Sequence, residues 1–221
     1  MILAAGRGER MRPLTDNVPK PLLRVGGKSL IDYHIAALVN AGVERIVINL
    51  AWQGEQIRSH VADGSAYGVE ILFSDEGQEA LETGGGVYQA LPLLGDEPFW
   101  LVNGDIYAEF SFDADRLAQR TLGHLLLVEN PSHNPDGDFA LKHSLINARG
   151  QPRYTFSGIS LLRPELFAGC QAGKFPLAPL LSAASDRRAI TGEFLQGYWT
   201  DVGTPERLAE LDLRLNTDVP R

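Results

Sequence analysis

Short runs of apolar and β-branched residues alternate with helix-forming stretches along the first half of the chain. This alternation predicts strands at residues 2–4, 45–50, 69–73 and 99–102, with helices between them at about 30–41, 55–61 and 86–93. Ser29 and Asp32 have the spacing of a capping box at the first helix, and Gly42 ends that helix. Strand–helix–strand order is typical of a parallel sheet covered by helices. We therefore expect an α/β fold.

The second half of the chain has a less regular pattern. It predicts strands at residues 125–129, 139–142 and 154–162, and helices at 177–184 and 205–216. Thr204 and Pro205 suit the N-cap and the first position of the last helix. No linker, repeat or low-complexity tract divides the sequence, so we expect a single domain over residues 1–221.

The charge balance limits the partners of the chain. It has 20 Lys and Arg against 28 Asp and Glu, a formal net charge of −8, which argues against a nucleic-acid partner. The single cysteine, Cys170, excludes an internal disulfide framework and fits a reducing compartment; we expect it to act as a small apolar side chain. The sequence has no signal-peptide pattern and no run of about 20 apolar residues. We expect a soluble cytoplasmic protein with no membrane or protein partner.

Glycines gather where the first predicted strand ends, in the segment LAAGRGERMRP at residues 3–13. Glycine leaves backbone N–H groups free to converge on an anion. Positive charge is added by Arg7, Arg10, Arg12 and Lys20. The segment therefore suits phosphate binding, although its spacing alone leaves a structural turn as the alternative.

Two other phosphate-binding motifs do not match the sequence of this region. A Rossmann loop requires its third glycine where this chain has Met11, which argues against a nicotinamide-dependent oxidoreductase. Gly27-Lys28-Ser29 is similar to the end of a P-loop, but Leu22 stands where the first glycine is required. No histidine has metal-ligand spacing, and we expect each to pack or to face solvent. The histidines are His34, His60, His124, His133 and His143.

Several ordered motifs carry a family resemblance. They are LAAGRGERMRPLT at residues 3–15 with PKPLL at 19–23, LETGGG at 81–86, VNGD at 102–105 and WTDVGT at 199–204. Together they resemble the sugar-phosphate nucleotidyltransferases, which join a nucleoside triphosphate to a sugar 1-phosphate. The resemblance implies a Rossmann-like three-layer αβα fold with a mixed, mainly parallel central sheet. It also implies that residues 1–110 bind the nucleotide and residues 111–221 the sugar.

The resemblance assigns roles to individual residues. The implied catalytic residues are Arg10, Lys20, Asp105 and Asp201. Arg10 would hold the triphosphate, Lys20 the α-phosphate and the sugar phosphate, and the two aspartates Mg²⁺. The implied nucleotide-binding residues are Leu3, Ala4, Ala5, Gly6, Gly8, Glu9, Arg10, Lys20, Glu82, Thr83, Gly84, Gly85 and Asn103. Those implied for the sugar phosphate are Lys20, Asn103, Ser157, Gly158 and Asp201.

Details within the motifs narrow the substrate. LETGGG and Phe156-Ser157-Gly158-Ile159 resemble the family's uridylyltransferases for muramyl 1-phosphates, which act in cell-wall recycling. A muramyl sugar carries a lactyl carboxylate, for which Arg24 and Arg153 are candidates by charge. Glu82 departs from the glycine that many members have there, and Trp199 is a candidate for a wall of the pocket.

Two alternatives to a muramyl uridylyltransferase remain. A mannose-1-phosphate guanylyltransferase, or another hexose-1-phosphate enzyme, would use the same chemistry. A noncatalytic nucleotide-sugar sensor would share the fold, because fold alone does not fix function. A pure binder, however, would not need Arg10, Lys20, Asp105 and Asp201 together.

Overall fold

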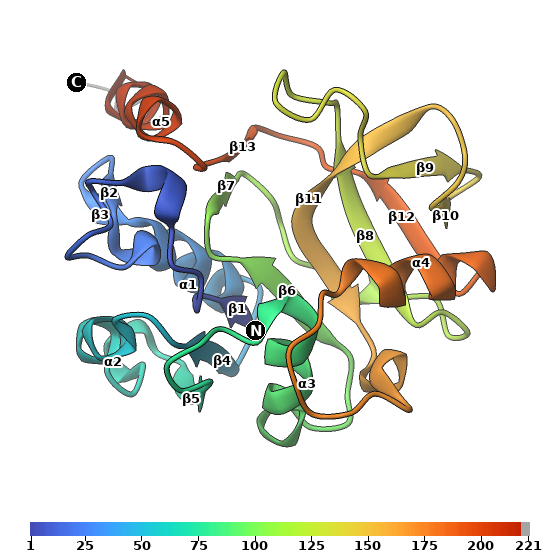
Figure 1. The fold of residues 1–221 in the computed structure, drawn as a ribbon, viewed down its shortest axis with the longest axis horizontal. Helices are drawn as coiled ribbons and strands as arrows, with labels where there is room; N and C mark the ends of the chain where they lie inside the picture. Colours follow the sequence, from blue (N-terminus) through green and yellow to red (C-terminus); the bar gives the residue numbers. More distant parts are fainter. Residues whose placement is uncertain (218–221) are drawn as a thin grey trace.

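A computed structural model describes residues 1–217, and one nine-stranded sheet runs through both halves of the chain (Figure 1). The strands follow the order β5-β4-β1-β6-β11-β8-β12-β10-β9. Their bounds are β1 Ile2–Leu3, β4 Arg45–Leu50, β5 Glu70–Asp75, β6 Phe99–Asn103, β8 Gly123–Val128, β9 Phe139–Lys142, β10 Leu145–Asn147, β11 Arg153–Leu162 and β12 Ile190–Phe194. Pairing is parallel from β5 to β6 and between β8 and β12, whereas β10 and β11 pair antiparallel with their neighbours. The sheet is therefore mixed, with four parallel and five antiparallel pairings among the described strands, and the predicted predominance of parallel pairing holds from β5 to β6.

Five α-helices and two small ribbons complete the described part of the chain. The helices are α1 Leu30–Asn40, α2 Gly54–Val61, α3 Glu82–Leu94, α4 Ala178–Asp186 and α5 Pro205–Thr217. The ribbons pair β2 Arg24–Val25 with β3 Lys28–Ser29, and β7 Ile106–Ala108 with β13 Trp199–Asp201. Within residues 1–217, no helix has both the length and the apolar character needed to cross a bilayer.

Alternate side chains of the central strands supply a separate core on each face of the sheet. In β4, Ile46 and Ile48 are buried with residues of α1 and α2, while Val47 is buried with residues of α3 and α4. Because helices cover both faces, the central strands are apolar over most of their length, as in Ile46–Ile48 of β4. Full burial of each such side chain contributes roughly 1.5–3 kcal/mol of transfer free energy. These three layers confirm the predicted fold class.

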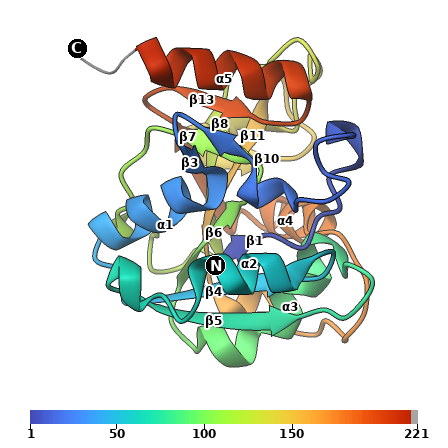
Figure 2. The same ribbon diagram turned by 90° about the vertical axis from the view of Figure 1, so that its left-hand side faces the viewer.

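A third apolar cluster joins the C-terminal helix to the loop that follows β1. Leu211 of α5 is buried together with Met11 and Val25. The backbone N–H of Gly26 also donates a hydrogen bond to Asp212, at 2.8 Å. Figure 2 shows α5 along one side of the molecule, next to β13. The last described helix thus fixes a segment near the start of the chain.

The structure differs from the predicted elements at several places, including the short strands β2, β3, β7, β10 and β13, where the sequence analysis predicts no strand. Helix α3 begins at Glu82 rather than at about residue 86, so the run 84–86 is helical although glycine usually weakens a helix. Strand β12 is not predicted, because Thr-Gly-Glu in its sequence is typical of a turn. A Cβ at Gly192 would lie 2.6 Å from the side chain of Ile146, so close packing against β10 explains this glycine. The capping box of α1 forms as predicted, with the Ser29 N–H 3.0 Å from the Asp32 carboxylate.

Candidate active site

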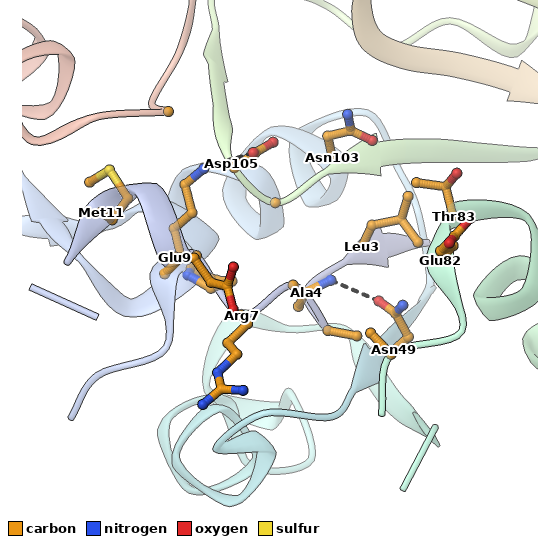
Figure 3. A pocket seen from close by; sticks show the side chains of 18 of the residues that line it. Leu3, Ala4, Arg7, Glu9, Met11, Asn49, Glu82, Thr83, Asn103 and Asp105 are labelled. Carbon is orange, nitrogen blue, oxygen red and sulfur yellow. Dashed lines mark hydrogen bonds and ion pairs between the residues drawn. The ribbon is translucent and has the colours of Figure 1, made fainter. Parts of the chain in front are cut away.

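The polar residues at the strand ends come together at one edge of the sheet. Leu3 of β1 is in register with Asn49 of β4 on one side and with Asn103 of β6 on the other. Because these strands are parallel, their carboxyl ends meet, and a cavity of about 500 Å³ opens there (Figure 3). We call it cavity 1. Open α/β sheets bind their ligands at this edge.

Cavity 1 is lined by most of the residues implied for nucleotide and phosphate binding. These are Leu3, Ala4, Ala5, Gly6, Gly8, Glu9, Arg10, Lys20, Glu82, Thr83, Asn103 and Asp105. At Gly6 a side chain would meet no atom within 4 Å, so the backbone there faces open space. A bare backbone bordered by cations is the arrangement that phosphate groups require.

The loop after β1 is held in place by packing. Gly8 has a φ of 65°, and a Cβ there would lie 3.1 Å from Thr15 and 3.2 Å from Lys20. The hydroxyl of Thr15 donates a hydrogen bond to the Gly8 carbonyl oxygen at 2.8 Å. Met11 is fully buried in the cluster beneath α5. The glycine is therefore required by a close approach as well as by its left-handed backbone.

The arginines of this loop have different surroundings. Arg10 is exposed and lines cavity 1, where it is free to reach a ligand. Arg7 also lines the cavity, but its guanidinium lies 4.6 Å from the ring centroid of Trp52, a cation–π contact. Arg12 lies outside the cavity and pairs with Asp16 at 3.3 Å. Arg10 is thus the arginine best placed for a triphosphate.

Lys20 and Asp105 form an ion pair inside cavity 1. Lys20 begins a short 3₁₀ helix, Lys20–Leu22, and its Nζ lies 2.7 Å from Oδ2 of Asp105. The lysine side chain is 9% exposed and the aspartate side chain 40%. An incoming phosphate can replace Asp105 as the partner of the ammonium group. The structure therefore places the two predicted residues in direct contact.

Two cavity residues that the sequence analysis did not single out, Asn49 and Glu76, connect three elements. The Ala4 N–H donates to Oδ1 of Asn49 at 2.7 Å, a bond drawn in Figure 3. The Asn49 amide donates to Glu76 at 2.6 Å, and the same carboxylate accepts the Leu81 N–H at 2.6 Å. These bonds tie the end of β1 to the start of α3. The polar Asn49 in the otherwise mostly apolar strand RIVINL is the sequence signal that could have identified this chain of hydrogen bonds.

The glycines at 84 and 85 have a different role from the predicted one. Neither lines cavity 1, although Glu82 and Thr83 do. A Cβ at Gly84 would lie 2.5 Å from the ring of Phe175, and one at Gly85 would collide with the Gly173 carbonyl oxygen. The family resemblance implies that these glycines allow close contact with the nucleotide. The structure corrects this prediction, because the segment that they allow to approach is the loop before α4.

A second cavity, of about 840 Å³, is lined by the segment 194–201 and contains the other predicted aspartate. Asp201 lines this cavity 2, whereas Gly203 lines cavity 1. Oδ1 of Asp201 lies 2.5 Å from Nη1 of Arg207 and 3.0 Å from Nε2 of His133. Sequence reasoning did not select Arg207, and it assigned His133 to packing or solvent.

The backbone segments that carry the two predicted metal ligands, Asp105 and Asp201, are hydrogen-bonded to each other, but the two carboxylates do not meet. In the β7–β13 ribbon the Val202 N–H donates to the Asp105 carbonyl oxygen at 2.7 Å. The carboxylates of Asp105 and Asp201 nevertheless line different cavities and contact different cations, Lys20 and Arg207. They do not form a preassembled pair in this conformation.

The donor set still fits Mg²⁺. Asp105, in the turn before β7, and Asp201, in β13, supply carboxylate oxygens, which are the ligands that this ion takes at triphosphate sites. Within residues 1–217, no cluster of three or more His, Cys, Asp or Glu side chains could hold a metal by itself. Asp105 and Asp201 would hold the ion after leaving their present cation partners.

The predicted sugar residues of β11 do not reach either cavity. Ser157 is fully buried, and its hydroxyl oxygen accepts the Ile159 N–H at 3.2 Å. Gly158 has a φ of 82°, and a Cβ there would lie 2.7 Å from the Asn103 amide nitrogen. The direct sugar contacts expected of Ser157 and Gly158 are therefore corrected. Gly158 instead makes room for Asn103, which does line cavity 1.

The two arginines proposed by charge for a sugar carboxylate are also used elsewhere. Arg24 donates to the Gly27 carbonyl oxygen at 2.5 Å within its own turn. Arg153 donates from Nε and Nη2 to the Asp138 carbonyl oxygen, at 3.1 and 2.5 Å. Neither lines cavity 1 or cavity 2. The structure therefore does not place either arginine where it could bind a sugar carboxylate in cavity 1 or cavity 2.

Comparison with known proteins identifies the family. Residues 1–121 match the sequence profile described as Nucleotidyl transferase, more than half of the 221 residues. The chain belongs to the nucleotidyl transferase family. The fold of this nucleotidyl transferase is similar to a solved structure from Bacillus anthracis, assigned as a glucose-1-phosphate thymidylyltransferase and complexed with sucrose. The TM-score is 0.84 at 20% identity, covering 100% of this chain and 95% of the other.

Two relatives of this nucleotidyl transferase match it over nearly their whole length. An N-acetylmuramate alpha-1-phosphate uridylyltransferase of Neisseria meningitidis serogroup B is 51% identical, covering 95% of each chain. A second, of Caulobacter vibrioides, is 34% identical, covering 97% of this chain and 96% of the relative. A mannose-1-phosphate guanylyltransferase catalytic subunit beta of Danio rerio is 28% identical, covering 93% of this chain but 61% of that protein.

Proposed function

We propose that this chain transfers a uridylyl group from UTP to N-acetylmuramate α-1-phosphate in the presence of Mg²⁺. The products are UDP-N-acetylmuramate and pyrophosphate. The observation that carries the proposal is 51% identity, over 95% of both chains, to a relative named for this activity. A place in cell-wall recycling and a cytoplasmic location, where nucleoside triphosphates are made, belong to the same proposal.

The reaction is an in-line displacement at phosphorus. An oxygen of the sugar phosphate attacks the α-phosphorus of UTP, and the new P–O bond forms as the bond to pyrophosphate breaks. No covalent enzyme intermediate is required. The protein must hold two polyanions in the attacking geometry and offset the charge that develops.

The side chains of cavity 1 suit these two tasks. Lys20 would exchange Asp105 for oxygens of the α-phosphate and the sugar phosphate, since its ammonium group already points into the cavity. Arg10, exposed at the loop, would hold the β- and γ-phosphates and then the leaving pyrophosphate. The backbone from Leu3 to Gly6, fixed by the hydrogen bond from Ala4 to Asn49, would face the base and ribose.

The two aspartates are assigned to the metal. Asp105 and Asp201 would hold Mg²⁺, which would offset the negative charge that develops on the phosphates. For this, Asp105 has to leave Lys20 and Asp201 has to leave Arg207. Binding of the phosphates by Lys20 therefore also releases a carboxylate.

A pyrophosphate-release assay tests the proposal. The panel pairs UTP, GTP, dTTP and ATP with N-acetylmuramate, N-acetylglucosamine, glucose and mannose 1-phosphates. We expect the highest kcat/KM for UTP with N-acetylmuramate 1-phosphate. A higher kcat/KM for GTP with mannose 1-phosphate would instead support the guanylyltransferase alternative. Nucleotide binding without turnover of any pair would support a noncatalytic sensor.

A further inference from the structure

One basic cluster in the structure is left unused by the transfer mechanism. Among the residues that line cavity 2, Arg207 is the only arginine or lysine and His133 the only histidine. The Arg207 side chain is 16% exposed, and its Nη1 lies 2.9 Å from Nε2 of His133 and 2.5 Å from Asp201. A largely buried guanidinium at the edge of a cavity is well suited to recognise an anion.

The local structure holds Arg207 in this position. It lies in the first turn of α5, where its N–H is 3.4 Å from the hydroxyl oxygen of Thr204. Its guanidinium lies against the Cα of Gly203, and a Cβ at that position would collide with Nη2. Since Gly203 lines cavity 1 and Arg207 lines cavity 2, the guanidinium stands between the two cavities.

The rest of cavity 2 suits a sugar but opposes a negative charge. Trp199 lines it, and the indole N–H donates to the Ser157 carbonyl oxygen at 2.8 Å, which fixes the ring as a wall. The cavity also contains the carboxylates of Glu129, Asp201 and Glu210. An acidic substituent would be repelled there unless a cation received it. Among the lining residues only Arg207 carries a fixed positive charge, and His133 lies beside it with a ring nitrogen 2.9 Å from Nη1.

We propose that Arg207 and His133 bind the lactyl carboxylate of the sugar substrate, and that this carboxylate replaces Asp201 on the guanidinium. The inference rests on the proposed function for the identity of the sugar. The Arg207 fork can hold one carboxylate through two N–H groups. The exchange would free Asp201, so a sugar with the carboxylate would favour the arrangement in which both aspartates are available for Mg²⁺. A sugar without it would leave Asp201 paired.

Binding measurements on two sugars isolate this role. N-acetylglucosamine 1-phosphate is the same sugar without the lactyl ether, and both sugars are titrated calorimetrically in the presence of a nonhydrolysable UTP analogue and without metal. We expect Arg207→Gln to weaken N-acetylmuramate 1-phosphate binding by about 10- to 100-fold, as for loss of a charged hydrogen bond. Binding of N-acetylglucosamine 1-phosphate should change by less than about twofold. Arg149→Gln removes one exposed cation outside both cavities and is the matched control.

The exchange with Asp201 has its own binding readout. Asp201→Asn should weaken the hold on Arg207 and therefore tighten metal-free binding of N-acetylmuramate 1-phosphate, with no such gain for N-acetylglucosamine 1-phosphate. An equal loss for both sugars in Arg207→Gln would overturn the inference, because it would mean that Arg207 only supports the start of α5.

A change in the substrate keeps the inference testable if the variant is unstable. The lactyl methyl ester of N-acetylmuramate 1-phosphate should bind to the wild-type protein as weakly as the free acid binds to Arg207→Gln. Wild-type protein that binds ester and acid equally would contradict the inference. Absence of turnover of N-acetylmuramate 1-phosphate by the wild type would instead reject the proposed function itself, and the carboxylate site with it.

Discussion

The ion pair between Lys20 and Asp105 joins two residues that are unequally buried. The lysine side chain is 9% exposed and the aspartate side chain 40%. Loss of Asp105 leaves a buried ammonium group without a counter-ion, whereas loss of Lys20 leaves a carboxylate that water can still reach. Substitution of either residue should reduce catalysis, but only substitution of Asp105 should strongly reduce the free energy of unfolding.

The first prediction uses this asymmetry. Asp105→Asn should lower the free energy of unfolding by about 1–2 kcal/mol, and Lys20→Met by less than about 0.5 kcal/mol. Each should lower kcat by about 10²- to 10³-fold, as expected when a charge-stabilising group is lost in phosphoryl transfer. Urea denaturation and the pyrophosphate-release assay measure the two effects. Normal turnover by Lys20→Met would remove Lys20 from the proposed mechanism.

Glu82 supports a second prediction, on stability. Its φ is 61°, a left-handed conformation that favours glycine, and the residue stands at the start of α3. Glu82→Gly should relieve this strain and, after allowing for the greater freedom of glycine in the unfolded chain, raise the free energy of unfolding by about 0.5–1 kcal/mol. Glu82→Ala keeps the strain and is the control. Thermal denaturation that ranks alanine above glycine would contradict this explanation.

At the scale of single residues, the sequence predicts which residue types belong to the site better than it predicts which atoms each side chain contacts. The family resemblance grouped Lys20 and Asp105 with the glycine loop, and all of them line one cavity. The same reasoning assigned Ser157 to the sugar, although its side chain is fully buried. Whether a polar side chain faces a ligand or a neighbouring strand depends on packing between segments distant in the chain, which residue type does not encode.

Helix α3 shows how packing decides the boundaries of an element. The loop before α4 lies over its first turn, where the Gly85 N–H donates to the Phe175 carbonyl oxygen at 3.0 Å. The Leu177 N–H donates to the Thr83 hydroxyl oxygen at 2.9 Å. A sequence with three adjacent glycines predicts a loop, because the contacts that stabilise the helix come from residues about 90 positions later.

The third prediction tests this contact. Gly84→Ala places a Cβ 2.5 Å from the Phe175 ring, so the loop has to move away from α3. We expect a loss of about 1–3 kcal/mol in the free energy of unfolding and weaker nucleotide binding, since Glu82 and Thr83 of the same turn line cavity 1. In a double-mutant cycle, Phe175→Ala should recover part of the stability lost in Gly84→Ala. Strict additivity of the two substitutions would contradict a direct clash.

Across the whole molecule, two buried histidines couple folding to pH. Burial lowers the pKa of His34 from 6.5 to about 4. Burial, and then the nearby Arg116, lower the pKa of His124 to about 4. Glu193 lies 4.0 Å from His124, but it already pairs with Arg116, so it does not restore the charged form. Both imidazoles are therefore neutral in the folded protein at pH 7.

The fourth prediction follows from linkage. Between pH 6.5 and 4 the unfolded chain binds more protons at these histidines than the folded chain does, so stability falls as pH falls through this window. Each histidine can contribute up to about 3 kcal/mol to the loss, and none above pH 6.5. Urea denaturation at pH 7 and pH 5 should show a smaller decrease for His124→Asn than for the wild type. His143→Asn, at an exposed position, should match the wild type; a slope unchanged in His124→Asn would contradict the burial argument.

The interleaving of β11 between β6 and β8 has a consequence during synthesis. Residues 1–121, the segment that matches the family profile, leave the ribosome before β11 has been made. Until Leu162 has emerged, the edge of β6 lacks its antiparallel neighbour, and the first turn of α3 still lacks Phe175. An unpaired apolar edge is a site where nascent chains aggregate. The growing chain thus exposes the apolar edge of β6 until β11 has been synthesised.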